Sequence, residues 1–375
     1  MHLFVGTFSF PYIYTLFFDP HAGHLNVTQA NQAIGGHHWL SLAADQKTLY
    51  AATYEPWRAA AYKVRREDGA LALLNSQPVA RQPGYVTVSK TQLYSVGGLS
   101  GEVFPLQGDG SLGSLSQALT FAEDKNGTDP GIRYGAHGVE LSPDGKTLYV
   151  TDIGSDGVWT FAVSAKSLTD QKFHPAVRQD DGSRHAWPHP NGKILYVIQE
   201  HSGMVDVFRV DRLPDGKVEK LEHLQGASVL PRGRNASNYW ADEIRLSTGP
   251  PNSPPKYLFT STRGLEDNVK GYVAAFELDS QGRMKSTDPL DIWETPTSGG
   301  WANAIEPAPW VASPDAPFLQ YLALTDDYAG TVRILMFDGT KIRDLCAVTL
   351  EVPAADRDRF NGTVRAATAV WLRPN

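Results

Sequence analysis

Four ionisable residues stand at corresponding places in neighbouring strand-like segments, and together they could bind and rearrange an organic anion. Arg184 lies seven residues before the Asn191-Gly192 turn, and Glu200 lies eight residues after it. The open ends of a hairpin's two strands lie together, so both residues are expected on one rim. His137 precedes a similar Asp-Gly turn by seven residues, and Arg263 ends the segment KYLFTSTRG. A histidine, two arginines and a carboxylate at one opening would suit an anionic substrate.

Other polar and aromatic residues are expected on the same rim. We predict substrate contacts for His38, Trp39, Tyr85, His185, Trp301 and Asn303, together with Arg184 and Arg263. Glu55 and Asp326 fall nearby, and with an amide they could imitate a calcium-binding ring. Two arginines in the same opening oppose a dication, so we expect no metal. Arg184 and Glu200 could instead form an ordinary rim salt bridge, and this alternative stays open.

The elements that must position these residues are short strands in a repeated unit. Each unit has an alternating strand, a turn, a second strand resembling LYV, a loop and an amphipathic third strand. Several units add a fourth strand, and the period of about 40–50 residues is typical of a β-propeller. Six such units are visible, at residues 37–64, 85–106, 135–163, 183–210, 242–278 and 303–337. A β-sandwich would not predict near-copies at this period.

The two ends of the sequence supply the remaining strands. Residues 3–30 provide about three strands and residues 363–374 provide one more. Joined, they make a seventh blade. We therefore predict an all-β fold, a single seven-bladed β-propeller domain over residues 1–375, with the ring closed by pairing of the N- and C-terminal strands.

Composition narrows the functional classes. The chain has 375 residues, a formal net charge of −7 and a single cysteine, Cys346. The acidic balance argues against a nucleic-acid binder, and the absence of a long apolar run argues against a membrane span. One cysteine permits no internal disulfide, which fits a reducing compartment. We expect a cytoplasmic protein.

Several strings resemble the lactonase-type seven-bladed propellers, which include bacterial 6-phosphogluconolactonase. These strings are HG…SPDGKTLYVTD, RH…HPNGKILYVIQE and STRG. A narrower resemblance, in TPTSGGWANAIEPAPW, LALTDDYAGTVRI and GYVAAFEL, is to the fungal 3-carboxy-cis,cis-muconate lactonizing enzymes, or carboxy-cis,cis-muconate cyclases. That resemblance implies a metal-independent cycloisomerase of aromatic catabolism in the β-ketoadipate pathway. It also implies that His137, Arg184, Glu200 and Arg263 are catalytic, and it suggests a homo-oligomer.

Lactonization of a muconate adds a carboxylate oxygen across a carbon–carbon double bond of the same molecule and protonates the neighbouring carbon. Arg184 and Arg263 would hold the carboxylates of a di- or tricarboxylate substrate and stabilise the enolate. His137, as an imidazolium, would donate the proton and Glu200 would orient it, although the reverse assignment stays open. An isomerization needs no cofactor. The alternatives are hydrolysis of a lactone on the same fold, and a peptide-binding scaffold without activity.

Overall fold

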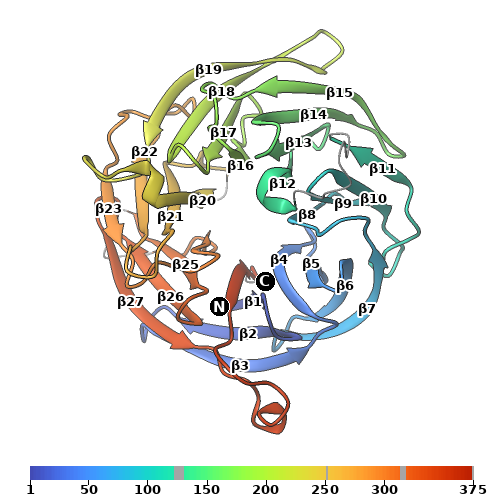
Figure 1. Cartoon of the computed structure of the whole chain (residues 1–375), viewed down its shortest axis with the longest axis vertical. Coiled ribbons are helices and arrows are strands. Elements are labelled where there is room, and N and C mark those ends of the chain that lie inside the picture. The colour runs from blue at the N-terminus through green and yellow to red at the C-terminus, as the bar shows by residue number, and fades with distance from the viewer. Residues whose placement is uncertain (122–130, 251, 313–317, 374–375) are drawn as a thin grey trace.

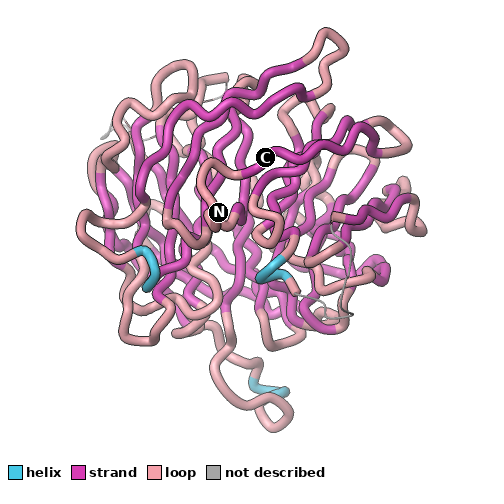
Figure 2. The backbone as a smooth tube through the Cα atoms, turned by 45° about the horizontal axis from the view of Figure 1, so that its top comes forward, coloured by secondary structure: helices cyan, strands magenta, loops and turns pink. Residues whose placement is uncertain are grey.

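The computed structural model describes residues 1–121, 131–250, 252–312 and 318–373, which form seven four-stranded antiparallel sheets around a central axis (Figure 1). The predicted seven-bladed propeller is therefore confirmed. Figure 2 shows that strands make up most of the body and that the short helices lie in connecting loops. No helix among the described residues is long and apolar enough to cross a membrane.

The strand bounds, from the axis outward in each blade, are as follows. The first three blades after the N-terminal strands are β4 (Gly36–Leu42), β5 (Thr48–Glu55), β6 (Arg58–Arg65) and β7 (Ala70–Pro78); β8 (Tyr85–Val88), β9 (Gln92–Gly97), β10 (Ser100–Pro105) and β11 (Gln117–Thr120); and β12 (Ala136–Leu141), β13 (Thr147–Asp152), β14 (Gly157–Val163) and β15 (Leu168–Pro175). The next three are β16 (Ser183–Pro188), β17 (Ile194–Gln199), β18 (Met204–Arg212) and β19 (Val218–Ser228); β20 (Tyr239–Leu246), β21 (Tyr257–Gly264), β22 (Tyr272–Glu277) and β23 (Asp291–Glu294); and β24 (Ile305–Pro307), β25 (Gln320–Asp326), β26 (Thr331–Phe337) and β27 (Ile342–Thr349). Short 3₁₀ helices cover Ile132–Tyr134, Ala236–Asn238 and Ala354–Asp356.

The last blade joins the two ends of the chain, as predicted. It contains β28 (Ala366–Trp371), β1 (His2–Thr7), β2 (Tyr12–Asp19) and β3 (His24–Gln32), with β28 innermost. Antiparallel pairing of Leu3 with Trp371 and of Phe4 with Val370 closes the ring. Figure 1 shows both termini beside the axis in this blade.

Burial explains why inner and outer strands differ in sequence. All six residues of β17 are buried, because blades pack on both faces of each inner strand. Outer strands such as β3 are largely exposed, and only two of its nine residues are buried. The turns between first and second strands use Gly145 and Gly192, whose φ angles of 68° and 69° favour glycine. The innermost strands therefore have fixed ends around the axis, and these ends carry the site.

Candidate active site

A pocket of about 370 Å³ lies on the axis, at the end of the ring where the innermost strands begin. We call it the axial pocket. Its polar lining comes mostly from β4, β12, β16, β20 and β21, with Arg133 from a 3₁₀ helix and Thr368 from β28, and its apolar lining comes largely from aromatic rings. The residues of the lining used below are Phe8, His38, Trp39, Tyr54, Arg133, His137, Arg184, His185, Asp242, Glu243, Arg263, Trp301 and Thr368.

A β-bulge at the start of each of four innermost strands places these side chains. The pairing register shifts across His38 in β4, His137 in β12, Arg184 in β16 and Asp242 in β20, so each is left out of the ladder. A bulge inserts one residue and re-aims the side chains around it. Consecutive residues, such as Arg184 and His185, therefore both line the pocket, which regular alternation would forbid.

Hydrogen bonds between neighbouring blades hold the bulges in register. Thr151 Oγ1 donates to the Arg184 carbonyl at 2.5 Å, and Thr368 Oγ1 donates to the His38 carbonyl at 2.9 Å. The backbone N–H of Asn303 donates to Asp242 Oδ2 at 2.6 Å. The pocket wall is thus fixed by backbone contacts before any ligand enters, which is the arrangement that preorganised sites require.

Most N–H donors of Arg184 are already bonded to other groups of the protein. Its Nε donates to the Asp242 carbonyl at 3.0 Å, one terminal nitrogen is 2.8 Å from Asp242 Oδ1, and the other is paired with Glu200. Burial acts to lower the pKa of Arg184, but Glu200 and Asp242 outweigh it and raise that pKa. The predicted pairing of Arg184 with Glu200 therefore exists, although it is buried rather than solvated.

Arg263 is much less satisfied. Its Nε is buried without a hydrogen-bond partner among the described residues and stands 3.5 Å from Asp242 Oδ1. One terminal nitrogen donates to the Gly300 carbonyl at 3.3 Å. Burial lowers the pKa of Arg263, and Asp242 offsets this only in part. A buried cation with unused donors is a strong candidate for the group that binds an anionic ligand.

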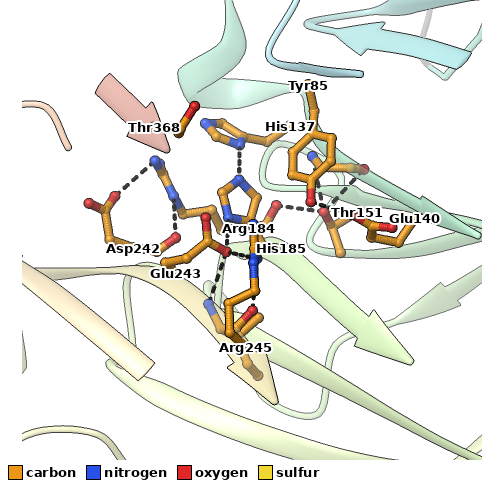
Figure 3. Close-up of polar contacts among 12 residues, drawn as sticks. Tyr85, His137, Glu140, Thr151, Arg184, His185, Asp242, Glu243, Arg245 and Thr368 are labelled. Atoms are coloured by element: carbon orange, nitrogen blue, oxygen red, sulfur yellow. Dashed lines mark hydrogen bonds and ion pairs between the residues drawn. The ribbon is translucent and has the colours of Figure 1, made fainter. Parts of the chain in front are cut away.

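Two histidines and a glutamate form a hydrogen-bonded chain along the pocket floor (Figure 3). His137 Nδ1 is 3.0 Å from His185 Nε2, and His185 Nδ1 is 3.0 Å from Glu243 Oε1. Burial, with Arg184 and His185 next in importance, holds the pKa of His137 well below its usual value. These effects favour a neutral His137 ring in the free protein, whereas an imidazolium is the proton donor expected from the sequence.

A second layer of charge lies under the floor. Glu243 also pairs with Arg245, whose Nε is 2.7 Å from Glu306. The guanidinium of Arg245 sits 4.3 Å from the centre of the Trp187 ring. Burial raises the pKa of Glu140, beside these groups, to about 7. This layer shields the chain of histidines from the opposite end of the ring.

Aromatic rings line the other wall of the pocket. Phe8 stacks on His38 with ring centres 5.9 Å apart and contacts Trp301 edge-on at 5.7 Å. Both ring nitrogens of His38 are buried without a hydrogen-bond partner among the described residues. Burial lowers the pKa of His38 to about 4, against a smaller opposing effect of the Pro83 and Gly84 backbone. This wall offers flat apolar surface to a conjugated or ring-shaped ligand.

A third cation stands at the pocket's border. The guanidinium groups of Arg133 and Arg263 lie 5.0 Å and 4.9 Å from the centre of the Trp240 ring. A neighbouring pocket of about 470 Å³ shares Arg133, Arg263 and Trp301 with the axial pocket. Arg133 therefore marks the passage between the two.

Seven of the residues predicted from the sequence line the axial pocket, and five do not. His38, Trp39, His137, Arg184, His185, Arg263 and Trp301 do so. Glu200 is buried behind Arg184, and Tyr85 is buried beneath Trp39, stacked on it with ring centres 3.5 Å apart. The Asn303 side chain donates to the Thr262 carbonyl at 2.9 Å, away from the pocket. The structure therefore places neither Tyr85 nor Asn303 in the lining of the axial pocket.

The remaining two, Glu55 and Asp326, do not form a ring of ligands with Asn303. Glu55 is exposed, and Asp326 accepts from Thr297 Oγ1 at 2.6 Å and from the Ala329 N–H at 2.9 Å. Within the part of the chain that the structure describes, no group of three or more His, Cys, Asp or Glu side chains is arranged to hold a metal ion.

The sequence patterns did not predict that Asp242 and Glu243 line the pocket. Both line the pocket, yet they stand in the segment YWADEIRL, where alternation would send one of them away from the axis. The signal that could have found them is the alignment of the repeats, which sets Asp242-Glu243 against Arg184-His185.

Comparison with known proteins agrees with the observed fold. A protein-family model described as "Lactonase, 7-bladed beta-propeller" matches residues 2–294. A protein named muconate cycloisomerase 1, from Cutaneotrichosporon cutaneum, is 37% identical over 99% of this chain and 98% of its own length. A carboxy-cis,cis-muconate cyclase from Neurospora crassa is 23% identical over 94% of this chain and 96% of its own. The solved structure of a periplasmic gluconolactonase from Pseudomonas aeruginosa superposes with a TM-score of 0.77 at 21% identity, covering 98% of each chain, which shows the shared fold.

Proposed function

Because the chain belongs to the family of seven-bladed lactonase propellers, we propose that it is a cycloisomerase that converts a cis,cis-muconate to a muconolactone. The substrate is cis,cis-muconate or its 3-carboxy derivative. The observation that carries the proposal is the presence, in one aromatic-walled pocket, of an under-bonded arginine, Arg263, and of His137, whose Nδ1 is bound to His185. The names of the two relatives above support the substrate class.

The reaction needs an anchored carboxylate and a proton at carbon. One carboxylate oxygen forms a new C–O bond to an alkene carbon, and the π electrons move to the adjacent carbon, giving an enolate on the second carboxylate. That carbon then takes one proton, which comes from solvent through the general acid, so the product carries one negative charge fewer than the substrate and no cofactor is required. Arg263 would bind the carboxylate that becomes the enolate, since its donors are available. Arg184 would add positive charge from behind.

His137 would supply the proton only after the substrate has bound. Arg184 and Arg263 help to keep His137 neutral in the free protein. Substrate carboxylates would offset both positive charges, so the pKa of His137 would rise on binding and the ring would take up a proton. Glu200 would act through Arg184 by fixing its orientation, because it is buried behind that side chain rather than in the pocket.

The direct test is loss of the diene absorbance when purified protein is mixed with each muconate in the presence of a chelator. Turnover of either acid supports the proposal, and no turnover of both contradicts it. His137→Gln should lower kcat by about 10²–10⁴-fold, which is the usual contribution of a positioned acid. The matched control is His174→Gln, which changes a buried histidine on an outer strand and should leave kcat unchanged.

The same test can separate the two substrates. A third carboxylate would meet Arg133 at the pocket's border. Arg133→Met should therefore raise KM for 3-carboxy-cis,cis-muconate while leaving KM for cis,cis-muconate nearly unchanged.

Lactone hydrolysis is the second candidate, and one observation favours it. A neutral His137 with a free Nε2 lone pair is a base in the resting protein, able to activate water against a bound lactone. The family description also refers to lactonases. Assaying a sugar lactone beside the two muconates decides between the reactions.

A further inference from the structure

We propose that His185 is a positioning residue which, with Glu243, fixes the proton of His137 on Nδ1 and stabilises the charged form of that ring. The inference rests on the proposed role of His137 as the proton carrier. It concerns two side chains that the reaction itself does not touch.

Glu243 determines which atom donates in each hydrogen bond of the series His137–His185–Glu243. Glu243 Oε1 accepts from His185 Nδ1 at 3.0 Å and from the Ile244 N–H at 3.0 Å, and it is paired with Arg245. Burial acts to raise the pKa of Glu243, but Arg245 and His185 outweigh it, so the carboxylate is ionised. An ionised carboxylate only accepts, hence His185 Nδ1 must carry a hydrogen.

The next two protons are then determined. Burial lowers the pKa of His185, partly opposed by Glu243, so that ring is neutral and its Nε2 holds a lone pair. His137 Nδ1, 3.0 Å away, must donate to it. His137 is neutral as well, so its Nε2 has no hydrogen, and this atom has no partner among the described residues. The lone pair of His137 is thereby aimed into the pocket.

Packing against aromatic side chains holds the imidazole of His185 in place. Trp39 and Tyr85 contact His185 edge-on, with ring centres 5.0 Å and 5.2 Å away. His185 is 2% exposed and Glu243 is 1% exposed, so water does not compete for their hydrogen bonds. A bulge residue such as His137 has no ladder partner of its own, and this chain supplies the orientation that the ladder does not.

The charged groups around His137 and His185 keep a proton on these two rings and give it no path to the other side of the protein. The groups that face the two rings from neighbouring strands are His38 on β4, Tyr85 on β8, Arg184 on β16, Arg245 on β20 and Arg263 on β21. Glu243, the last member of this hydrogen-bonded series, is paired with Arg245, and a guanidinium cannot accept a proton. When His137 Nε2 takes a proton, the charge can be shared toward Glu243, but it must return to the pocket. Lactonization adds one proton to a substrate carbon in each turnover, so a proton taken up from solvent must be delivered back into the pocket.

The tautomer can be tested without any substrate. Long-range ¹H–¹⁵N NMR spectra of the ligand-free protein should show His137 and His185 as neutral rings, each with its hydrogen on Nδ1. A hydrogen on His137 Nε2, or a charged His185, would overturn the proposal. This measurement stands even if neither muconate proves to be a substrate, so the two failures can be told apart.

Two substitutions at one position test the effect on catalysis. His185→Phe keeps a ring but removes both hydrogen bonds, and it should lower kcat about 100-fold with KM changed by less than about threefold. His185→Gln can still accept from His137 and donate to Glu243, so it should recover at least about tenfold of that loss. Equal loss in both variants, or wild-type kcat in His185→Phe, would show that His185 does not position His137.

Discussion

Two guanidinium groups that face the same pocket differ in how much of their hydrogen-bonding capacity is already used. Arg184 is tied to Glu200 and to both the side chain and the backbone of Asp242. Among the described residues, the polar contacts of Arg263 are Asp242, at 3.5 Å, and a long hydrogen bond to the Gly300 carbonyl. At the scale of single residues, one arginine therefore supports the site and the other is free to bind.

Replacing each arginine with methionine should separate these roles. Arg184→Met leaves two buried carboxylates without their partner, which costs about 3–5 kcal/mol of unfolding free energy. Arg263→Met should leave stability nearly unchanged but raise KM at least about tenfold, the value of one charged hydrogen bond. Denaturant unfolding and steady-state kinetics on both variants check the contrast. Equal effects on stability would contradict it.

At the scale of elements, a β-bulge at the start of an innermost strand directs consecutive side chains into the pocket. Period-two alternation predicted the strands, the Asn191-Gly192 dipeptide predicted a turn, and the strands left over at the two ends of the sequence predicted the pairing of the chain ends. These patterns could not predict that Asp242 and Glu243 face the axis together, because a bulge depends on tertiary hydrogen bonds that no local pattern encodes. Tyr85 and Asn303 lie outside the pocket because Tyr85 stacks on Trp39 and the Asn303 side chain donates a hydrogen bond to the Thr262 carbonyl.

Gly138 lets two neighbouring innermost strands approach each other at such a bulge. A Cβ at this position would stand 2.6 Å from Thr151 Oγ1, 2.8 Å from the Arg184 carbonyl and 2.9 Å from His185. Gly138→Ala should therefore cost about 1–3 kcal/mol of stability and lower kcat, because His185 must move. Thermal unfolding and kinetics measure both. Gly108→Ala is the control, since a Cβ there meets no atom within 4 Å; equal losses in the two variants would refute the argument.

At the scale of the whole molecule, ring closure depends on the last strand. β28 is innermost in its blade, and Ala366, Ala369 and Trp371 are buried there. Deleting residues 364–375 should leave β1 and its neighbours unpaired and abolish cooperative unfolding, as followed by circular dichroism. Thr368→Val, which removes only the bond to the His38 carbonyl, should retain a cooperative transition. A cooperative transition in the truncated protein would show that the ring does not need this strand.

Buried histidines should make the molecule sensitive to acid. Burial lowers the pKa of His37 to about 3 and that of His38 to about 4, so below pH 6.5 the unfolded chain binds protons that the folded chain refuses. Stability should fall from pH 6.5 downward by about 1.4 kcal/mol per pH unit for each such group. Urea unfolding at pH 7, 6 and 5 measures this.

Glu140 should have the opposite effect on the pH dependence of stability. Its pKa is raised to about 7 by burial, so the folded state gains stability as pH falls from 7 toward 4.5. Glu140→Gln removes this gain, and its stability should decline with acid more steeply than that of the wild type. Parallel curves for the two proteins would contradict the assignment.

The four bulge residues at positions 38, 137, 184 and 242 lie outside the strand ladders, while the ladders themselves hold the blades together. The side chains of these four residues are thereby separate from the backbone hydrogen bonds that form the ladders. A mutant library limited to these sites would redesign what the protein accepts while each sheet kept its full set of rungs. Diversification by duplication and drift within such a scaffold would follow the same route.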